Sequence, residues 1–306
     1  MIDVKNLKKS YKDQEVLKDI NFKISKGEIY GFLGQNGAGK STTMNILTGL
    51  IKYNSGDITI AGFDMKKEYK KIINIIGYLP ENPKFYPYMT GREYLKFICE
   101  IKGLDKLETS KKIDKLLELV KLNKASKRKI GGYSRGMRQR LGIAVSLIND
   151  PKILFLDEPS SALDPEGRKD VVKIIESLKS LKITIFLSTH ILSDVERICD
   201  RIGILNEGNI VLEDSLERLK NKYILPVYDI EFSNNCEDLN NNFNKYDWIE
   251  KIKTNNKKMS IYVKNRFKAD RKLLNIISNI ENTVLSYKIR KSKLEEIFLQ
   301  VVNNNE

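Results

Sequence analysis

The sequence has no run of consecutive apolar residues close to the ~18 that a membrane-spanning helix needs. Its first residues, Met1-Ile-Asp-Val4, lack the basic and then apolar pattern of a secretory signal. The three cysteines, Cys99, Cys199 and Cys236, stand singly, which argues against a metal knuckle or a disulfide framework and fits a reducing compartment. We therefore expect a cytoplasmic protein.

Acidic residues are in the minority, with 40 Asp and Glu against 54 Lys and Arg, so the formal net charge is +14. A basic surplus can indicate a nucleic acid or an anionic lipid surface as partner. Here the lysines are dispersed and are not gathered with aromatic residues into one stripe, which favours a bias of composition. We expect no nucleic-acid partner, and the charge alone does not decide the function.

A glycine-rich segment, Gly34-Gln-Asn-Gly-Ala-Gly-Lys-Ser-Thr42, lies between the apolar run 29–33 and a helical pattern. The order of strand, glycine turn and helix is that of a P-loop, whose backbone N–H groups and helix N-terminus hold a polyphosphate. Lys40 would reach the β- and γ-phosphates, and the Ser41 hydroxyl would bind Mg²⁺. The nucleotide-binding residues expected in this loop are Gly34, Gln35, Asn36, Gly37, Ala38, Gly39, Lys40, Ser41 and Thr42. Kinases, GTPases, helicases and transporter motors all carry such a loop, so the rest of the chain must decide among them.

The P-loop belongs to a predicted α/β domain over residues 1–215. Residues 2–33 alternate apolar and polar positions, which predicts short antiparallel strands, and residues 56–60 read as another strand of the same sheet. Helical periodicity then predicts an insert, a helical subdomain of about residues 86–145, whose last helix begins around Arg138. An α-helical insert therefore interrupts the sheet.

A further strand is predicted before this insert, and two buried parallel strands are predicted after it. Residues 75–81 read as a strand that runs into a loop, and the apolar runs 153–156 and 183–189 each end in polar side chains. Such side chains, at the carboxyl ends of parallel strands, are where an open α/β sheet binds its ligand.

Residues 216–306 have a different organisation and no second P-loop, which predicts a small accessory α/β domain. Its predicted elements are a polar helix 216–222, a strand 227–232, a hairpin turning at Asn255-Asn256, an amphipathic helix 273–280, a strand 284–289 and a final helix 294–302. The last helix either docks on its own domain or serves as a dimer contact or regulatory segment.

Nucleotide hydrolysis at a P-loop needs a metal anchor, a group that positions water and a group that senses the γ-phosphate. Asp157 ends a buried strand and would hold Mg²⁺, and Glu158 beside it could take a proton from the attacking water. His190, the single histidine, ends the next strand and could contact the γ-phosphate. Ser134 and Gly136 precede a helix and could form another phosphate cradle.

Together these residues resemble the nucleotide-binding subunit of an ABC transporter, over about residues 1–215. Gly34 to Thr42 match its Walker A motif, Tyr133 to Met137 its signature, Ile153 to Glu158 its Walker B motif, Ser161 to Asp164 its D-loop and His190 its switch histidine. Tyr11 stands where the family stacks an aromatic ring on adenine, although a lone tyrosine more often serves packing. The resemblance implies ATP and Mg²⁺ as cofactors, with the signature of one subunit capping the ATP of a second. With one P-loop per chain, the partner would be a second copy or a related ATP-binding subunit.

Two departures from the family pattern indicate which branch of the family the sequence resembles. Tyr133, Arg135 and Met137 replace three residues of the usual Leu-Ser-Gly-Gly-Gln signature, and the serine and glycine that touch phosphate are kept. Glu81 stands where a glutamine is usual; it could still reach Mg²⁺ or water, but its charge could slow turnover. Both departures resemble bacterial two-component exporters of drugs, antimicrobial peptides, polysaccharide or sodium.

This branch implies an ATPase subunit on the inner face of the cell membrane, attached only through a separate transmembrane permease. The expected docking surface for that permease includes the aromatic residues Phe85, Tyr86 and Tyr88, unless these only pack within the insert. The alternatives are a soluble ABC ATPase acting on the ribosome or on DNA, an importer motor, and a subunit that gates or senses without transport. The transported substrate, the composition of the ATPase pair and the role of the C-terminal domain are not encoded in any motif.

Overall fold

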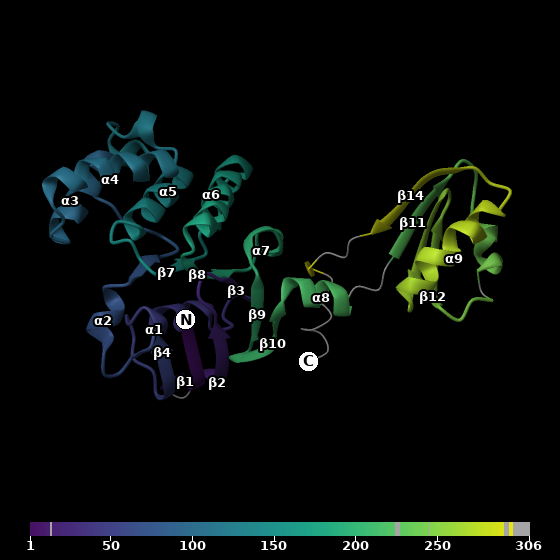
Figure 1. Ribbon diagram of the computed structural model, residues 1–306, viewed down its shortest axis with the longest axis horizontal. Helices are drawn as coiled ribbons and strands as arrows, with labels where there is room; N and C mark the ends of the chain where they lie inside the picture. The colour runs from purple at the N-terminus through teal and green to yellow at the C-terminus, as the bar shows by residue number, and fades with distance from the viewer. Residues whose placement is uncertain (13, 224–226, 244, 291–293, 296–306) are drawn as a thin grey trace. The chain divides into compact units, whose positions relative to one another are not determined.

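The computed structural model describes residues 1–12, 14–223, 227–243, 245–290 and 294–295. The chain separates into two compact units, of which one holds Met1–Leu216 and the other Glu217–Gln300. Within the described ranges, no helix has the length and apolar character needed to cross a membrane. The two units are described in turn (Figure 1).

A four-stranded antiparallel sheet opens the first unit, in the order β2-β1-β4-β5. Its strands are β1 (Ile2–Tyr11), β2 (Gln14–Ile24), β4 (Ser55–Ile60) and β5 (Phe63–Asp64). The alternating apolar side chains of β2 turn inward, so that Phe22 packs on Tyr30, Phe32 and Phe186 with ring centroids 5.8 Å apart in each pair. This aromatic layer joins the antiparallel sheet to the central sheet.

The central sheet has six strands in the order β10-β9-β3-β8-β7-β6, and β10 alone runs antiparallel to its neighbour. The strands are β3 (Ile29–Gly34), β6 (Ile76–Leu79), β7 (Ile153–Asp157), β8 (Thr184–Thr189), β9 (Arg201–Asn206) and β10 (Asn209–Ser215). The prediction that placed residues 29–33 among the antiparallel strands is wrong, because every residue of β3 is buried and the strand pairs in parallel with β8 and β9. A strand covered on both faces has no polar alternation.

Four helices accompany this sheet: α1 (Lys40–Leu47), α2 (Tyr69–Ile73), α6 (Pro165–Leu178) and α7 (Leu192–Ile198). The predicted helical insert comprises α3 (Gly91–Ile101), α4 (Lys106–Leu119) and α5 (Arg135–Ser146), which lie together outside both sheets (Figure 1). A capping box between Thr90 and Glu93 starts α3. The predicted start of the last helix at Arg138 is wrong by three residues, because the Ser134 side chain caps α5 and lets it begin at Arg135.

The second unit is a four-stranded antiparallel sheet, in the order β12-β13-β11-β14, with one long helix packed on one face. After α8 (Leu216–Tyr223) its elements are β11 (Val227–Phe232), β12 (Ile249–Asn255), β13 (Lys258–Val263), α9 (Arg266–Ser278) and β14 (Val284–Arg290). The predicted hairpin turns where expected, with Asn256 at φ +51. The predicted helix at 294–302 lies almost entirely outside the described residues.

Candidate active site

The P-loop runs from the end of β3 at Gly34 to the start of α1 at Lys40. Gly37 and Gly39 have φ of +86 and +111, which only glycine adopts without strain. A Cβ on Gly39 would also lie 2.6 Å from Leu17 Cδ2, so β2 packs directly against the loop. The first turn of α1 has no acidic residue and no side-chain cap, which leaves its N–H groups for an anion.

Lys40 is buried inside the loop that it follows. Its Nζ donates to the carbonyl oxygens of Gly34 at 2.9 Å and of Gln35 at 3.1 Å. The same Nζ lies 3.6 Å from Oε1 of Glu158. Ser41 is exposed and Thr42 half-buried on the first turn of α1, and Gln35 to Gly37 form the exposed side of the loop. The lysine therefore links the P-loop to the end of β7.

Asp157 is the last residue of β7, and its buried carboxylate accepts a hydrogen bond from the Ser188 hydroxyl of β8. Burial raises the pKa of Asp157 most, the Ser188 hydrogen bond opposes this, and the charges of Glu158 and Glu81 raise the pKa further. A nearby cation would stabilise the charged form of a carboxyl group whose pKa is raised in this way.

Glu158 leaves the strand with φ +45, a left-handed conformation that is uncommon outside glycine. Its N–H donates to the Ser188 carbonyl at 3.1 Å, and the buried carboxylate turns toward His190. His190 Nδ1 lies 2.9 Å from Oε2, and this oxygen accepts no hydrogen bond from any other described residue. The His190 side chain is itself 47% exposed, so the carboxylate lies at the edge between the core and solvent.

The structure thus brings together Lys40, Asp157, Glu158 and His190. Among the described residues, no hydrogen bond or ion pair joins these four to Tyr11, Ser134 or Gly136. Asp164 occupies the N-cap position of α6 without capping it.

Ser134 and Gly136 lie where α5 begins. The Ser134 hydroxyl accepts from the Met137 N–H at 3.2 Å. A Cβ on Gly136 would lie 3.5 Å from Cα of Gly167, so the first turn of α5 contacts the first turn of α6 through the backbone. The signature motif, Tyr133 to Met137, and the helix α6 that follows the D-loop are therefore neighbours within one chain.

Tyr11 ends β1 and is 47% exposed, with the Lys9 ammonium 4.6 Å from its ring centroid. A ring that packed in the core would be buried, so the position of Tyr11 is compatible with a flat ligand but does not identify one. The contact between Leu17 and Gly39 holds its sheet against the P-loop.

Asp194 on α7 is a buried carboxylate that no sequence motif singles out. The Ser160 hydroxyl donates to its Oδ2 at 2.6 Å, and Nε of Arg168 donates to its two oxygens at 2.9 and 3.1 Å. Ser160 precedes the D-loop, Arg168 lies on α6, and Asp194 follows His190 by four residues. This carboxylate therefore ties the D-loop to the segment that carries His190.

Comparison with known proteins agrees with this geometry. The ABC transporter family model matches residues 17–161. An uncharacterised ABC transporter ATP-binding protein of Bacillus subtilis, YxlF, is 37% identical over 99% of this chain and 100% of its own length. The bacitracin transport ATP-binding protein BcrA of Bacillus licheniformis is 43% identical over 73% of this chain and 74% of its own.

Among solved structures, the dimeric post-hydrolysis state of the ATP-binding cassette MJ0796, bound to ADP and Pi, covers 71% of this chain and 99% of its own. It superimposes with a TM-score of 0.65 at 27% sequence identity. These similarities confirm the fold class predicted from the sequence, a P-loop ABC cassette with a mostly parallel core sheet, an antiparallel sheet and a helical insert. The chain belongs to the ABC transporter family, as an ATP-binding subunit of the kind that hydrolyses ATP.

Proposed function

We propose that this subunit powers a separate membrane permease and that Glu158 is the general base of its ATPase. The observation that carries the assignment is the buried Glu158 carboxylate, which lies between Lys40 and His190 and directly follows Asp157. In this proposal the Glu158 carboxylate takes a proton from water, while Lys40 and His190 bind the γ-phosphate. Asp164 of the D-loop and the P-loop residues other than Lys40 complete the proposed nucleotide site.

Mg²⁺ would be held by the Ser41 hydroxyl and the Asp157 carboxylate, with Glu81 within reach of the same place. The described residues contain no cluster of three or more metal-binding side chains, which fits a cation that takes its other ligands from phosphate and water. The raised pKa of Asp157 fits as well, because a buried carboxylate is stabilised by such a cation. When bound, Mg²⁺ neutralises charge on the transferred phosphate.

The active form we propose is a pair of ATP-binding subunits, either two copies or this chain with a relative. Ser134 and Gly136 would then cap the nucleotide of the opposite subunit, with Tyr11 against its own adenine. The dimeric cassette structure named above supports such an arrangement. Residues 1–215 would form the motor, and residues 216–306 an accessory domain.

Export is the direction we propose, on the inner face of the cell membrane and in contact with lipid only through the permease. Similarity to a bacitracin transport protein supports a role in transport, and the variants at Glu81 and in Tyr133 to Met137 favour export. The test is to tag the protein in its native cell, solubilise membranes in mild detergent and identify what copurifies. A polytopic partner without a solute-binding protein is the expected result, and recovery only with ribosomes or DNA would overturn the proposal.

Changing Phe85 and Tyr86 to Ser should uncouple ATP hydrolysis from the permease and spare basal hydrolysis. Phe85 contacts Tyr94 with ring centroids 5.1 Å apart, and Tyr86, which is 47% exposed, contacts the neighbouring ring of Tyr88. The measurement is ATPase activity with and without the reconstituted permease. A fall in basal activity would instead assign these rings to packing of the insert.

Changing Glu81 to Gln should raise turnover several-fold. The Glu81 charge raises the pKa of Asp157, and in the proposed site it would also repel the γ-phosphate. An amide keeps the shape and removes that repulsion. Steady-state ATPase assays over a range of Mg²⁺ concentrations check this, and slower turnover would show that the carboxylate itself is needed.

A further inference from the structure

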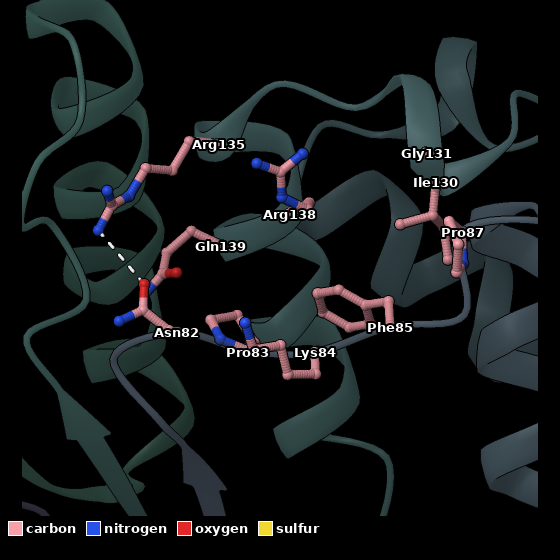
Figure 2. Close-up of a pocket in the computed structure, with 10 residues that line it drawn as sticks. All are labelled: Asn82, Pro83, Lys84, Phe85, Pro87, Ile130, Gly131, Arg135, Arg138 and Gln139. Carbon is pink, nitrogen blue, oxygen red and sulfur yellow. Dashed lines mark hydrogen bonds between the residues drawn. The ribbon is translucent and has the colours of Figure 1, made fainter.

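A pocket of about 440 Å³ lies on the second unit, between the segment 242–246 and the second half of α9 with the residues that follow it. Its lining residues are Asn242, Lys245, Tyr246, Lys272, Asn275, Ile276, Asn279 and Ile280. A pocket of similar size in the first unit includes Phe85 of the expected permease surface (Figure 2). The pocket of the second unit contains no residue of that surface, and its volume suits a small molecule.

The least exposed lining residues of this pocket are apolar or aromatic. Tyr246, Ile276 and Ile280 are half-buried and pack against the core of the second unit. The Tyr246 ring also contacts the buried ring of Trp248, with ring centroids 5.6 Å apart. A ligand can therefore bury an apolar body here, and a ligand that moves Tyr246 also changes the surroundings of Trp248.

The charged lining residues of the pocket are both cationic. Lys245 and Lys272 are exposed, and neither enters an ion pair with any residue that the structure describes. The Lys245 ammonium lies 5.4 Å from the centroid of the Tyr246 ring, so this charge is held over the aromatic part of the pocket. The acidic neighbours in the chain, Asp247 and Glu281, do not line the pocket. A negative group on a ligand would therefore meet two unneutralised positive charges.

Three asparagine side chains add neutral hydrogen-bonding groups to the rim. Across the described part of the chain, the side chains of Asn242 and Asn275 have no hydrogen-bond partner, and Asn279 Nδ2 donates to the Asn275 carbonyl at 2.9 Å. Amide and ammonium N–H groups are the side-chain donors that bind the oxygens of phosphate and carboxylate groups. Together with the apolar part of the pocket, they favour a ligand that is both apolar and anionic.

We infer that this pocket binds an amphipathic anion. Its apolar body packs on Tyr246 and Ile276, and its phosphate or carboxylate group accepts hydrogen bonds from Lys245 and Lys272. The inference assigns a ligand site to the second unit. It does not depend on the permease or on the proposed roles of the ATPase residues.

The test follows the fluorescence of Trp248 in the full chain, because the sequence contains a single tryptophan. ADP and Mg²⁺ are present throughout, so that the P-loop is filled and does not compete for the probes. Hexyl phosphate and hexanoate serve as amphipathic anions, inorganic phosphate as an anion without an apolar body, and hexyl glucoside as an apolar body without charge. Calorimetry of the same mixtures measures binding independently of the fluorescence.

At least one of the two amphipathic anions should change the Trp248 emission saturably, with a Kd on the order of 0.1–1 mM for a ligand of this size. Inorganic phosphate and hexyl glucoside should each bind at least about tenfold more weakly, because each lacks one of the two kinds of contact. The tighter of the two anions identifies the head group that the lysines prefer.

A pair of variants tests the role of the charge. Lys272→Gln removes one cation at an exposed position and should weaken binding of the amphipathic anion about tenfold. Lys288→Gln makes the same change at an exposed position of β14 outside the pocket and should leave binding unchanged. Both variants should unfold at the same urea concentration as the wild type, since neither side chain is buried.

Three results would overturn the inference: no binding of either amphipathic anion by fluorescence and by calorimetry, equal affinity for hexyl glucoside, or equal affinity of the Lys272→Gln and Lys288→Gln proteins for the anion. Equal affinity for the glucoside would mean that the pocket binds apolar groups without regard to charge. The proposed function stands in all three cases, because none of these measurements involves the permease or Glu158.

Discussion

Replacing Glu158 with Gln should lower ATP turnover by about 10² to 10⁴, the contribution that a general base typically makes. The carboxylate is buried, with Lys40 Nζ 3.6 Å from Oε1 and His190 Nδ1 2.9 Å from Oε2. An amide fills the same space and cannot take a proton from water. Because it also removes a negative charge from beside the proposed γ-phosphate position, ATP should bind at least as tightly and hold two subunits in a stable dimer.

The rate of phosphate release measures the turnover. Size-exclusion chromatography in ATP with light scattering gives the molar mass and so detects the dimer. The matched control is Glu118→Gln, which neutralises an exposed carboxylate of α4 and should leave turnover unchanged. Normal turnover in the Glu158→Gln protein would contradict the assignment of Glu158 as the general base. Loss of ATP binding would instead give Glu158 a structural role in placing Lys40.

Replacing Arg168 with Leu should lower the free energy of unfolding by about 2 to 3 kcal/mol. The Asp194 side chain is 9% exposed, and among the described residues it would keep only the Ser160 hydroxyl as a side-chain partner. Removing one member of a fully buried pair costs about 3–5 kcal/mol, and the smaller value reflects the 33% exposure of Arg168. Urea denaturation of the full chain measures the loss.

The control is Arg197→Leu, which breaks an ion pair of 2.7 Å with Glu176 between the same two helices. Both of those side chains are at least 40% exposed, so the expected loss is at most about 1 kcal/mol. Equal losses in the two variants would mean that Asp194 contributes no more than a surface ion pair. Combining Arg168→Leu with Asp194→Leu should recover part of the stability, because no unpaired carboxylate then remains buried.

The parts of the site that could be predicted from the sequence are the polar side chains that stand at the end of a buried strand. Asp157 and His190 each follow a buried apolar run, and parallel strands bring such ends to one edge of a sheet. The hairpin at Asn256 was readable for a similar reason, since paired asparagines favour left-handed turns.

The features that sequence could not supply depend on contacts across the fold. Ser188 supports Asp157 only because β7 and β8 are neighbours in register, which strand order alone does not specify. In the sequence, Asp194 is an acidic residue in the first turn of a helical segment like many others. Its role follows only from its hydrogen bonds with Ser160 and Arg168 in the structure. The strands β9 and β10 were missed because their chain segment carries no motif, although β9 lies beside the P-loop strand.

The glycine contact between α5 and α6 has a mechanical consequence. A Cβ on Gly167 would lie 3.7 Å from Cα of Gly136, so no side chain separates the first turns of the two helices. Rotamer changes, which usually absorb small displacements between packed helices, are not available at this joint. A shift imposed on Ser134 from outside should therefore pass to the first turn of α6, next to Asp164, by direct backbone contact.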